Sequence, residues 1–169
     1  MKAQAIVYTS NTGFTKEYAR ILAEKTALPL YSLESAKKAI PYGSEIIYLG
    51  WLMASFVKGY DKASKQFRIN AVIGVCMGES GSQLEAVRKN NKIPESTALF
   101  TLQGGFDMKK LKGMNKLMMK IMAKKLTKDI MAKEARTEED EKILLMLGEG
   151  ASFVSERNLE SVIEFAKNS

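Results

Sequence analysis

The sequence of 169 residues contains no histidine, one cysteine and three prolines, and it has no long hydrophobic run. The lack of histidine excludes catalytic triads and metal sites that depend on imidazole. With Cys76 alone, an internal disulfide is excluded, which is typical of proteins in the reducing cytosol. No stretch approaches the ~18 apolar residues that cross a bilayer, and the polar residues Gln4, Thr9 and Ser10 interrupt the N-terminal stretch, unlike a secretory signal. We therefore expect a cytoplasmic protein.

Positive charge is concentrated in one segment of the chain. The sequence has 26 basic and 19 acidic residues, a net charge of +7. Nine lysines and one acid, Asp129, lie between Met108 and Lys133, so this segment has a balance of +8 and the rest of the chain −1. A binding surface for a partner should be sought in this basic segment.

Apolar runs alternate with helical patterns along the first hundred residues. The runs predicted as strands are 3–8, 29–31, 45–49, 71–76 and 97–102. Helical patterns follow at about 13–26, 33–39, 59–66 and 83–89. This order predicts an α/β fold with a five-stranded parallel sheet and helices on both faces. Ligands of such sheets bind beyond the carboxyl ends of the strands.

The loop after the first predicted strand is rich in hydroxyl groups. It consists of Ser10, Asn11, Thr12, Gly13, Phe14 and Thr15, and a helical pattern follows at once. Unpaired N–H groups and the positive end of the helix dipole favour an anion at such a loop. The glycine spacing and the lack of Gly-Lys-Ser/Thr exclude a dinucleotide turn and a Walker loop. The alternative is an ordinary strand-to-helix turn with capping hydroxyls.

The same stretch resembles the phosphate-binding signature of flavodoxins. The matching residues are Ile6, Val7, Tyr8, Ser10, Gly13, Thr15, Ala19 and Leu22. The resemblance implies a flavodoxin-like three-layer sandwich with strand order 2-1-3-4-5, and flavin mononucleotide (FMN) bound non-covalently with its phosphate in this loop. We expect one such domain over 1–169, with a basic helical insertion at about 106–136.

Two further loops complete the predicted FMN site. Trp51, Leu52, Met53 and Ala54 follow the third predicted strand, where the resemblance implies a loop against the flavin ring. An indole there could stack on the flavin, and the alternative is that Trp51 belongs to the core or to a surface patch. Met77, Gly78, Glu79 and Ser80 follow the fourth strand, on the other side of the flavin. Many flavodoxins place a stacking tyrosine there, which this chain lacks.

The basic segment also carries an apolar stripe. Met114, Leu117, Met118, Ile121 and Met122 recur at helical spacing. The stripe could pack on its own domain with the lysines solvated. Alternatively, 108–128 could lie on an anionic membrane surface, on the inner face of the membrane, or dock an acidic partner. Nucleic acid is disfavoured because no aromatic residues interleave the lysines.

The insertion is similar to that of one branch of flavodoxin domains. Gly104, Gly105, Phe106 and Asp107, followed by Leu111, resemble the branch that includes menaquinone-dependent protoporphyrinogen oxidase. This implies a membrane or a large hydrophobic substrate, such as a quinone or a porphyrinogen. We expect an FMN-dependent oxidoreductase. The alternatives are a soluble electron carrier with a redox partner and a flavin-free interaction module. No motif identifies a catalytic acid or base, and none identifies a metal site.

Overall fold

The computed structural model describes residues 2–107, 109–111 and 113–168. Met108 and Lys112, which belong to the predicted basic segment, lie outside these ranges. The main sheet has five parallel strands and one short antiparallel strand, β4 (Phe56–Val57). The parallel strands are β1 (Ala5–Thr9), β2 (Leu30–Ser32), β3 (Glu45–Met53), β5 (Arg68–Cys76) and β6 (Ala98–Gln103).

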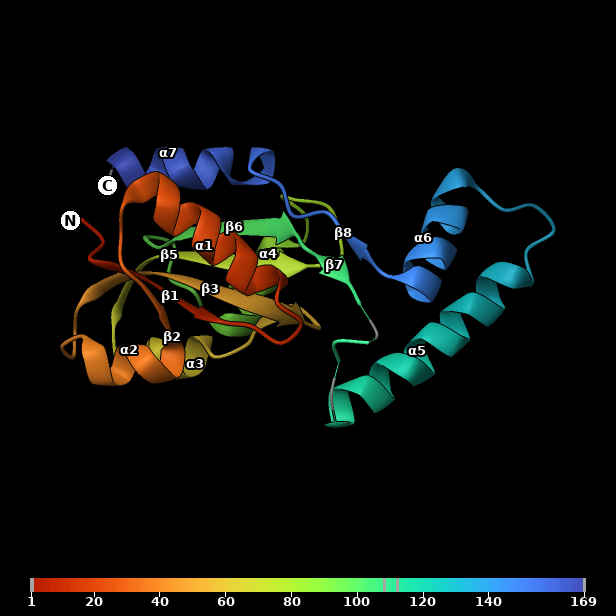
Figure 1. The fold of residues 1–169 in the computed structure, drawn as a ribbon, viewed down its shortest axis with the longest axis horizontal. Helices are drawn as coiled ribbons and strands as arrows, with labels where there is room; N and C mark the ends of the chain where they lie inside the picture. The colour runs from red at the N-terminus through yellow and green to blue at the C-terminus, as the bar shows by residue number, and fades with distance from the viewer. Residues whose placement is uncertain (1, 108, 112, 169) are drawn as a thin grey trace. The chain divides into compact units, whose positions relative to one another are not determined.

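The strand order is β2-β1-β3-β5-β6, with every neighbouring pair parallel (Figure 1). Counted along the parallel strands alone, this is 2-1-3-4-5, so the predicted flavodoxin-like α/β fold is confirmed. The helices that connect or follow these strands are α1 (Phe14–Thr26), α2 (Leu33–Ala39), α3 (Tyr60–Ala63), α4 (Leu84–Asn91) and α7 (Glu160–Asn168), the last preceded by the 3₁₀ turn η1 (Arg157–Leu159).

Both faces of the sheet are buried, which explains why its strands read as nearly continuous apolar runs. Successive strand residues point to opposite faces, so Ile6 packs with α1 and α7 while Val7 packs with α2, α3 and α4. On the first face Leu22 of α1 and Val162 of α7 are fully buried. On the second face Val87 of α4 is fully buried.

Two elements differ from the sequence prediction. The third strand was expected to end at residue 49 but continues to Met53, because the hairpin with β4 supplies a further partner for its end. The helix expected over 59–66 is only the single turn Tyr60–Ala63. The pairing of β3 with β4 is a contact that the periodicity of the sequence does not reveal.

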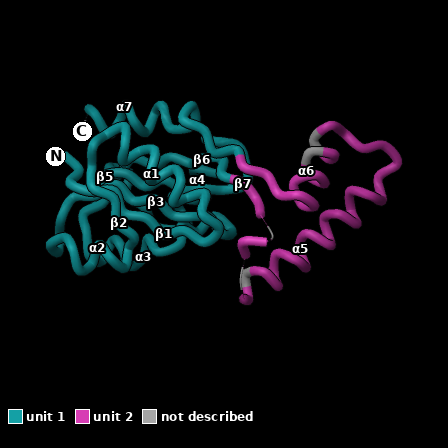
Figure 2. Tube along the Cα trace, in the orientation of Figure 1, with its two compact units in different colours: residues 1–104, 153–169 teal, residues 105–152 magenta. Residues whose placement is uncertain are grey.

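The chain forms two compact units (Figure 2). Unit 1 comprises 1–104 and 153–169 and contains the main sheet, whereas unit 2 comprises 105–152, which includes the range 106–136 that we expected as an insertion. Within unit 1, the Phe153 N–H donates to the Gly104 carbonyl at 2.7 Å, so the chain leaves and re-enters this unit at one place.

Tyr18 of α1 forms hydrogen bonds next to the junction where the chain leaves and re-enters unit 1. Its side chain is fully buried, and its hydroxyl donates to the Gln103 carbonyl at 2.6 Å and accepts from Asn158 Nδ2 at 2.7 Å. Burial raises the pKa of the Tyr18 phenol, with the Asn158 hydrogen bond acting in the opposite direction. The hydroxyl therefore remains a neutral donor and acceptor between helix, strand end and returning chain.

Unit 2 contains a two-stranded ladder and two helices. Strands β7 (Gly105–Phe106) and β8 (Ala151–Ser152) pair antiparallel, and α5 (Gly113–Met131) leads through a short connection to α6 (Glu138–Glu149). Helices α5 and α6 contact each other.

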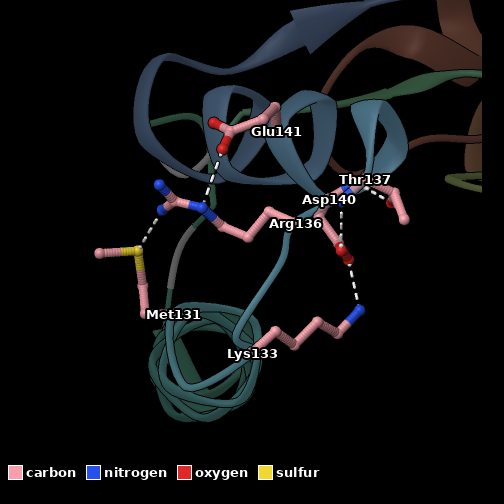
Figure 3. Close-up of polar contacts among 6 residues, drawn as sticks. All are labelled: Met131, Lys133, Arg136, Thr137, Asp140 and Glu141. Carbon is pink, nitrogen blue, oxygen red and sulfur yellow. Dashed lines mark hydrogen bonds and ion pairs between the residues drawn. The ribbon is translucent and has the colours of Figure 1, made fainter.

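A polar cluster organises the connection between α5 and α6 (Figure 3). Thr137 and Asp140 form a reciprocal capping box at the start of α6, and Asp140 Oδ1 also accepts from Lys133 Nζ at 2.7 Å. The Lys133 hydrogen bond is the main cause of a lowered pKa at Asp140. Arg136 Nε lies 2.9 Å from Glu141 Oε1, which adds a second ion pair. The start of α6 is therefore defined by side chains that its sequence provides locally.

Helix α5 has a shielded side and an exposed apolar side. Met119, Ala123 and Thr127 are half-buried, and Ile130 is buried. All five residues of the predicted stripe are exposed, namely Met114, Leu117, Met118, Ile121 and Met122. Among the described residues, no helix is both long enough and apolar enough to cross a membrane.

Replacing Tyr18 by phenylalanine tests the polar contact at the junction. We expect Tyr18→Phe to lower the free energy of unfolding by about 1–2 kcal/mol, because the Gln103 carbonyl loses its donor in a buried place. Urea denaturation of the purified variant measures the change. The matched control is Tyr42→Phe, since Tyr42 is 77% exposed and should change the stability by less than about 0.5 kcal/mol. Equal effects of the two variants would contradict this role for Tyr18.

Candidate functional site

The carboxyl ends of β1, β3, β5 and β6 meet at one edge of the sheet. The register pairs Thr9 with Gly50, Trp51 with Val75, and Cys76 with Gln103. The loops that follow these strands therefore begin side by side. The predicted site residues from three distant parts of the sequence are brought to this edge, where α/β sheets bind their ligands.

The first of these loops, Ser10–Gly13, forms a turn that leads into α1. Ser10 Oγ accepts from the Gly13 N–H at 3.2 Å, and Gly13 adopts a left-handed conformation with φ = 101° as the N-cap of α1. A Cβ atom at Gly13 would have no atom within 4 Å, and no side-chain cap bonds the helix start. Asn11 is exposed and Thr12 half-buried. The turn thus presents hydroxyl and amide groups, with open space before a helix N-terminus.

The other two predicted residues of this segment have a different position. Phe14 and Thr15 belong to the first turn of α1 and are 7% and 2% exposed. Phe14 packs in the core with α7, so its side chain anchors the turn. The polar surface of the loop consequently comes from Ser10, Asn11, Thr12 and backbone groups.

The segment expected as a loop at 52–56 is a tight β-hairpin. Leu52 pairs with Val57 and Met53 with Phe56, and the two turn residues Ala54 and Ser55 both have positive φ, 49° and 63°. This is the pattern of a type I′ turn, which glycine or asparagine usually occupies. The turn is therefore strained at its tip, and contacts elsewhere must hold it.

Asn91 at the end of α4 provides those contacts. Its Oδ1 accepts from the Val57 N–H at 2.9 Å, and its Nδ2 donates to the Ser55 carbonyl at 2.8 Å and to the Val87 carbonyl at 2.7 Å. The Ser55 hydroxyl also donates to Gln83 Oε1 at 3.1 Å. One amide side chain thus fastens the hairpin to the helix behind it. The sequence offers no motif that would have identified Asn91.

Trp51 is half-buried and lies at the base of the hairpin, next to Lys58. The Lys58 N–H donates to the Trp51 carbonyl at 3.0 Å, and Lys58 Nζ lies 5.7 Å from the centroid of the indole ring. The Tyr48 hydroxyl donates to the Lys58 carbonyl at 2.8 Å and lies 2.8 Å from the Thr9 hydroxyl. Burial raises the pKa of the Tyr48 phenol, so this hydroxyl remains protonated. Lys58 is therefore held beside the strand that carries the first loop.

Leu52, Met53 and Ala54 have distinct roles in the hairpin. Leu52 packs against the backbone of Gly74, where a Cβ would lie 2.9 Å from the leucine Cδ2 atom. Met53 is half-buried, and Ala54 is exposed in the turn. Gly50 permits the hairpin to fold over β3, since a Cβ there would lie 2.6 Å from Val57 Cγ1.

The loop after β5 is fixed by hydrogen bonds to β6. Ser80 Oγ accepts from the Gln103 N–H at 3.0 Å, and the Met77 carbonyl accepts from Gln103 Nε2 at 3.4 Å. The Gly78 carbonyl accepts from the Cys76 thiol at 3.4 Å. Met77 and Glu79 are exposed at the surface of the loop. Burial raises the pKa of the Cys76 thiol, which makes it a poor nucleophile at neutral pH.

A model of the flavodoxin domain matches residues 5–133, well over half of the chain. The chain belongs to the flavodoxin domain family. Comparisons with curated proteins and with solved structures find no significant match. The membership agrees with the observed strand order, and it does not identify a branch within the family.

The first loop of this flavodoxin domain fits the phosphate of FMN. Its donors are hydroxyls and backbone N–H groups, and 10–15 contains no carboxylate that would repel an anion. The open space at Gly13 lies at the positive end of α1. Among the residues that the structure describes, no group of three or more histidine, cysteine, aspartate or glutamate side chains could hold a metal ion.

Removing the Asn91 side chain tests how the hairpin is held. We expect Asn91→Ala to lower the free energy of unfolding by about 1–3 kcal/mol, since the Val57 N–H and the Ser55 carbonyl lose partly buried hydrogen bonds. The amide of Val57 should also exchange its hydrogen faster with solvent. Asn90→Ala is the control, because Asn90 is exposed on the same helix. Unchanged exchange at Val57 in Asn91→Ala would refute this role.

Proposed function

We propose that this protein is an FMN-binding oxidoreductase of the flavodoxin type. The observation that carries the proposal is the Ser10–Gly13 turn at the start of α1, with donor groups, open space at a left-handed glycine and family membership over 5–133. The hydroxyls of Ser10 and Thr12 and the first N–H groups of α1 would hold the phosphate. The strand ends beside this loop would hold the ring.

Bound FMN supplies one- and two-electron transfer, and the residues of this chain orient it and exclude water. Trp51 offers an apolar ring surface beside the first loop, and the hairpin that contains it is fastened by Asn91. The loop from Met77 to Ser80 contributes backbone groups fixed by Gln103. No motif in this set identifies a catalytic acid or base, so we assign none.

A visible spectrum and one charge substitution test the proposed cofactor. The purified protein, with FMN added if it is colourless, should show bound-flavin absorbance. Thr12→Glu should weaken FMN binding by at least about a hundredfold, because a carboxylate would face the phosphate at short range. Equilibrium dialysis with FMN measures the affinity. The control is Ser64→Glu, an exposed position after α3, which should bind FMN as the wild-type protein does.

Two results would contradict the proposal in different ways. A wild-type protein that fails to bind FMN would favour the flavin-free interaction module. Binding that Thr12→Glu leaves unchanged would show that the phosphate lies elsewhere.

We propose further that α5 lies on an anionic membrane surface and brings the flavin domain to a hydrophobic electron acceptor or substrate. The exposed fractions of the stripe residues range from 38% at Met118 to 74% at Met114. Lys116, Lys120, Lys124, Lys125 and Lys128 are exposed on the same helix. An apolar face flanked by lysines suits the interface of a bilayer with anionic lipids. At 19 residues the helix is roughly 28 Å long, enough for several such contacts.

A lipid-soluble quinone or a porphyrinogen would fit this placement. These molecules partition to the membrane, and a protein that reduces or oxidises them must reach that surface. The competing function is a soluble electron carrier. Such a protein would leave the apolar stripe in contact with water, which is unfavourable. The stripe therefore favours the membrane enzyme, of the kind that the protoporphyrinogen oxidase resemblance implies.

Vesicle sedimentation tests the membrane proposal. The protein should sediment with vesicles that contain phosphatidylglycerol, less at high salt, and not with phosphatidylcholine alone. Ile121→Glu should reduce the bound fraction about tenfold or more, because it places a charge in the stripe. Leu145→Glu on α6 is the matched control, since Leu145 is 60% exposed and Ile121 is 62% exposed. Equal binding by both variants, or none by the wild-type protein, would refute the proposal.

A further inference from the structure

We propose that Lys58 is the cation that stabilises the reduced form of the bound flavin and so raises its reduction potential. The inference rests on the proposed FMN site and adds a residue and an effect to it. Lys58 does not belong to the phosphate loop, and no sequence motif includes it. Its position at the base of the hairpin carries the inference.

Lys58 is held at this place by three contacts from different directions. Its N–H donates to the Trp51 carbonyl, and its carbonyl accepts from the Tyr48 hydroxyl. Its ammonium group lies 5.7 Å from the centroid of the Trp51 indole. The next residue, Gly59, has φ = 83°, and a Cβ there would lie 2.6 Å from Thr9 Oγ1. The Lys58 backbone is thus packed against the end of β1, directly before the Ser10–Gly13 turn.

Within the described part of the chain, no neighbouring acid balances the charge of Lys58. Among the described residues, no carboxylate oxygen lies within 4 Å of Lys58 Nζ. Its side chain is half-buried, so its field is screened less than that of a fully exposed lysine. Residues 10–15 contain no basic side chain. Among the described residues, Lys58 is therefore a cation without an acidic partner, next to the Trp51 indole and with its backbone near the end of β1.

A cation in this position distinguishes the two oxidation states of FMN. Reduction adds two electrons and one proton, so the ring system gains one negative charge. The phosphate keeps the same charge in both states. A positive group near the ring therefore stabilises reduced FMN more than oxidised FMN, which raises the potential. A positive group at the phosphate would stabilise both states equally.

Measurements on Lys58→Gln, Lys58→Arg and Lys65→Gln distinguish a cation near the flavin ring from a cation near the phosphate. Lys65 is exposed after α3 and lines a hollow with Tyr42 and Arg68, so Lys65→Gln removes a charge at another part of the surface. Dissociation constants of oxidised FMN and riboflavin follow from titration of each apoprotein, with the fluorescence of the single tryptophan, Trp51, as signal. Reductive titration with dithionite and a reference dye gives the potential, and hence the affinity for reduced FMN.

We expect Lys58→Gln to weaken the binding of reduced FMN about threefold to tenfold more than that of oxidised FMN, which lowers the potential. Lys58→Arg should keep the wild-type ratio of the dissociation constants of oxidised and reduced FMN, because arginine keeps the charge and the contact with the indole. Lys65→Gln should leave the ratio unchanged.

Three outcomes would overturn the inference. If Lys58→Gln left the ratio of the two FMN dissociation constants unchanged, Lys58 would only pack on Trp51. If Lys58→Gln weakened the binding of oxidised and reduced FMN equally and left riboflavin binding unchanged, Lys58 would contact the phosphate. A wild-type protein that binds no FMN would refute the proposed function together with this inference, whereas the first two outcomes leave that function intact.

Discussion

The parallel pairing of β1, β3, β5 and β6 is the constraint on which the candidate site depends. Because these strands run in the same direction and in the observed register, their carboxyl ends reach one edge together. The Ser10–Gly13 turn, the hairpin and the loop after β5 then become neighbours, although about seventy residues separate the first from the last. Packing on both sheet faces stabilises this register, since a one-residue slip would exchange the side chains that pack on the two faces.

Three buried or half-buried polar side chains hold segments that strand pairing alone does not fix. The Tyr18 hydroxyl joins α1 to the end of β6, the Tyr48 hydroxyl joins β3 to Lys58, and Asn91 joins α4 to the hairpin. Each satisfies backbone groups that a loop would otherwise leave without partners. These contacts hold the strained turn of the hairpin and the backbone of Lys58 in defined positions.

In unit 2, local sequence signals set the helix boundaries. Examples are the capping box of Thr137 and Asp140 and the ion pair of Asp140 with Lys133. The apolar stripe on α5 is exposed, and lysines dominate the charge of the helix. A surface of this kind has a physical explanation if it meets a partner, and an anionic bilayer complements both its charge and its apolar character.

The pattern of apolar runs predicted the fold class, the flavodoxin resemblance implied the strand order, and the hydroxyl-rich stretch predicted a loop at Ser10–Gly13. Uninterrupted apolar runs and a hydroxyl-rich turn before a helix are local patterns, so they can be read along the chain. Three features became visible only in the folded chain, namely the hairpin at 52–57, the burial of Phe14 and Thr15, and the contacts of Asn91 and Lys58 with the hairpin. These features depend on contacts between residues far apart in sequence, or on turn strain that those contacts support, and neither leaves a periodic signal.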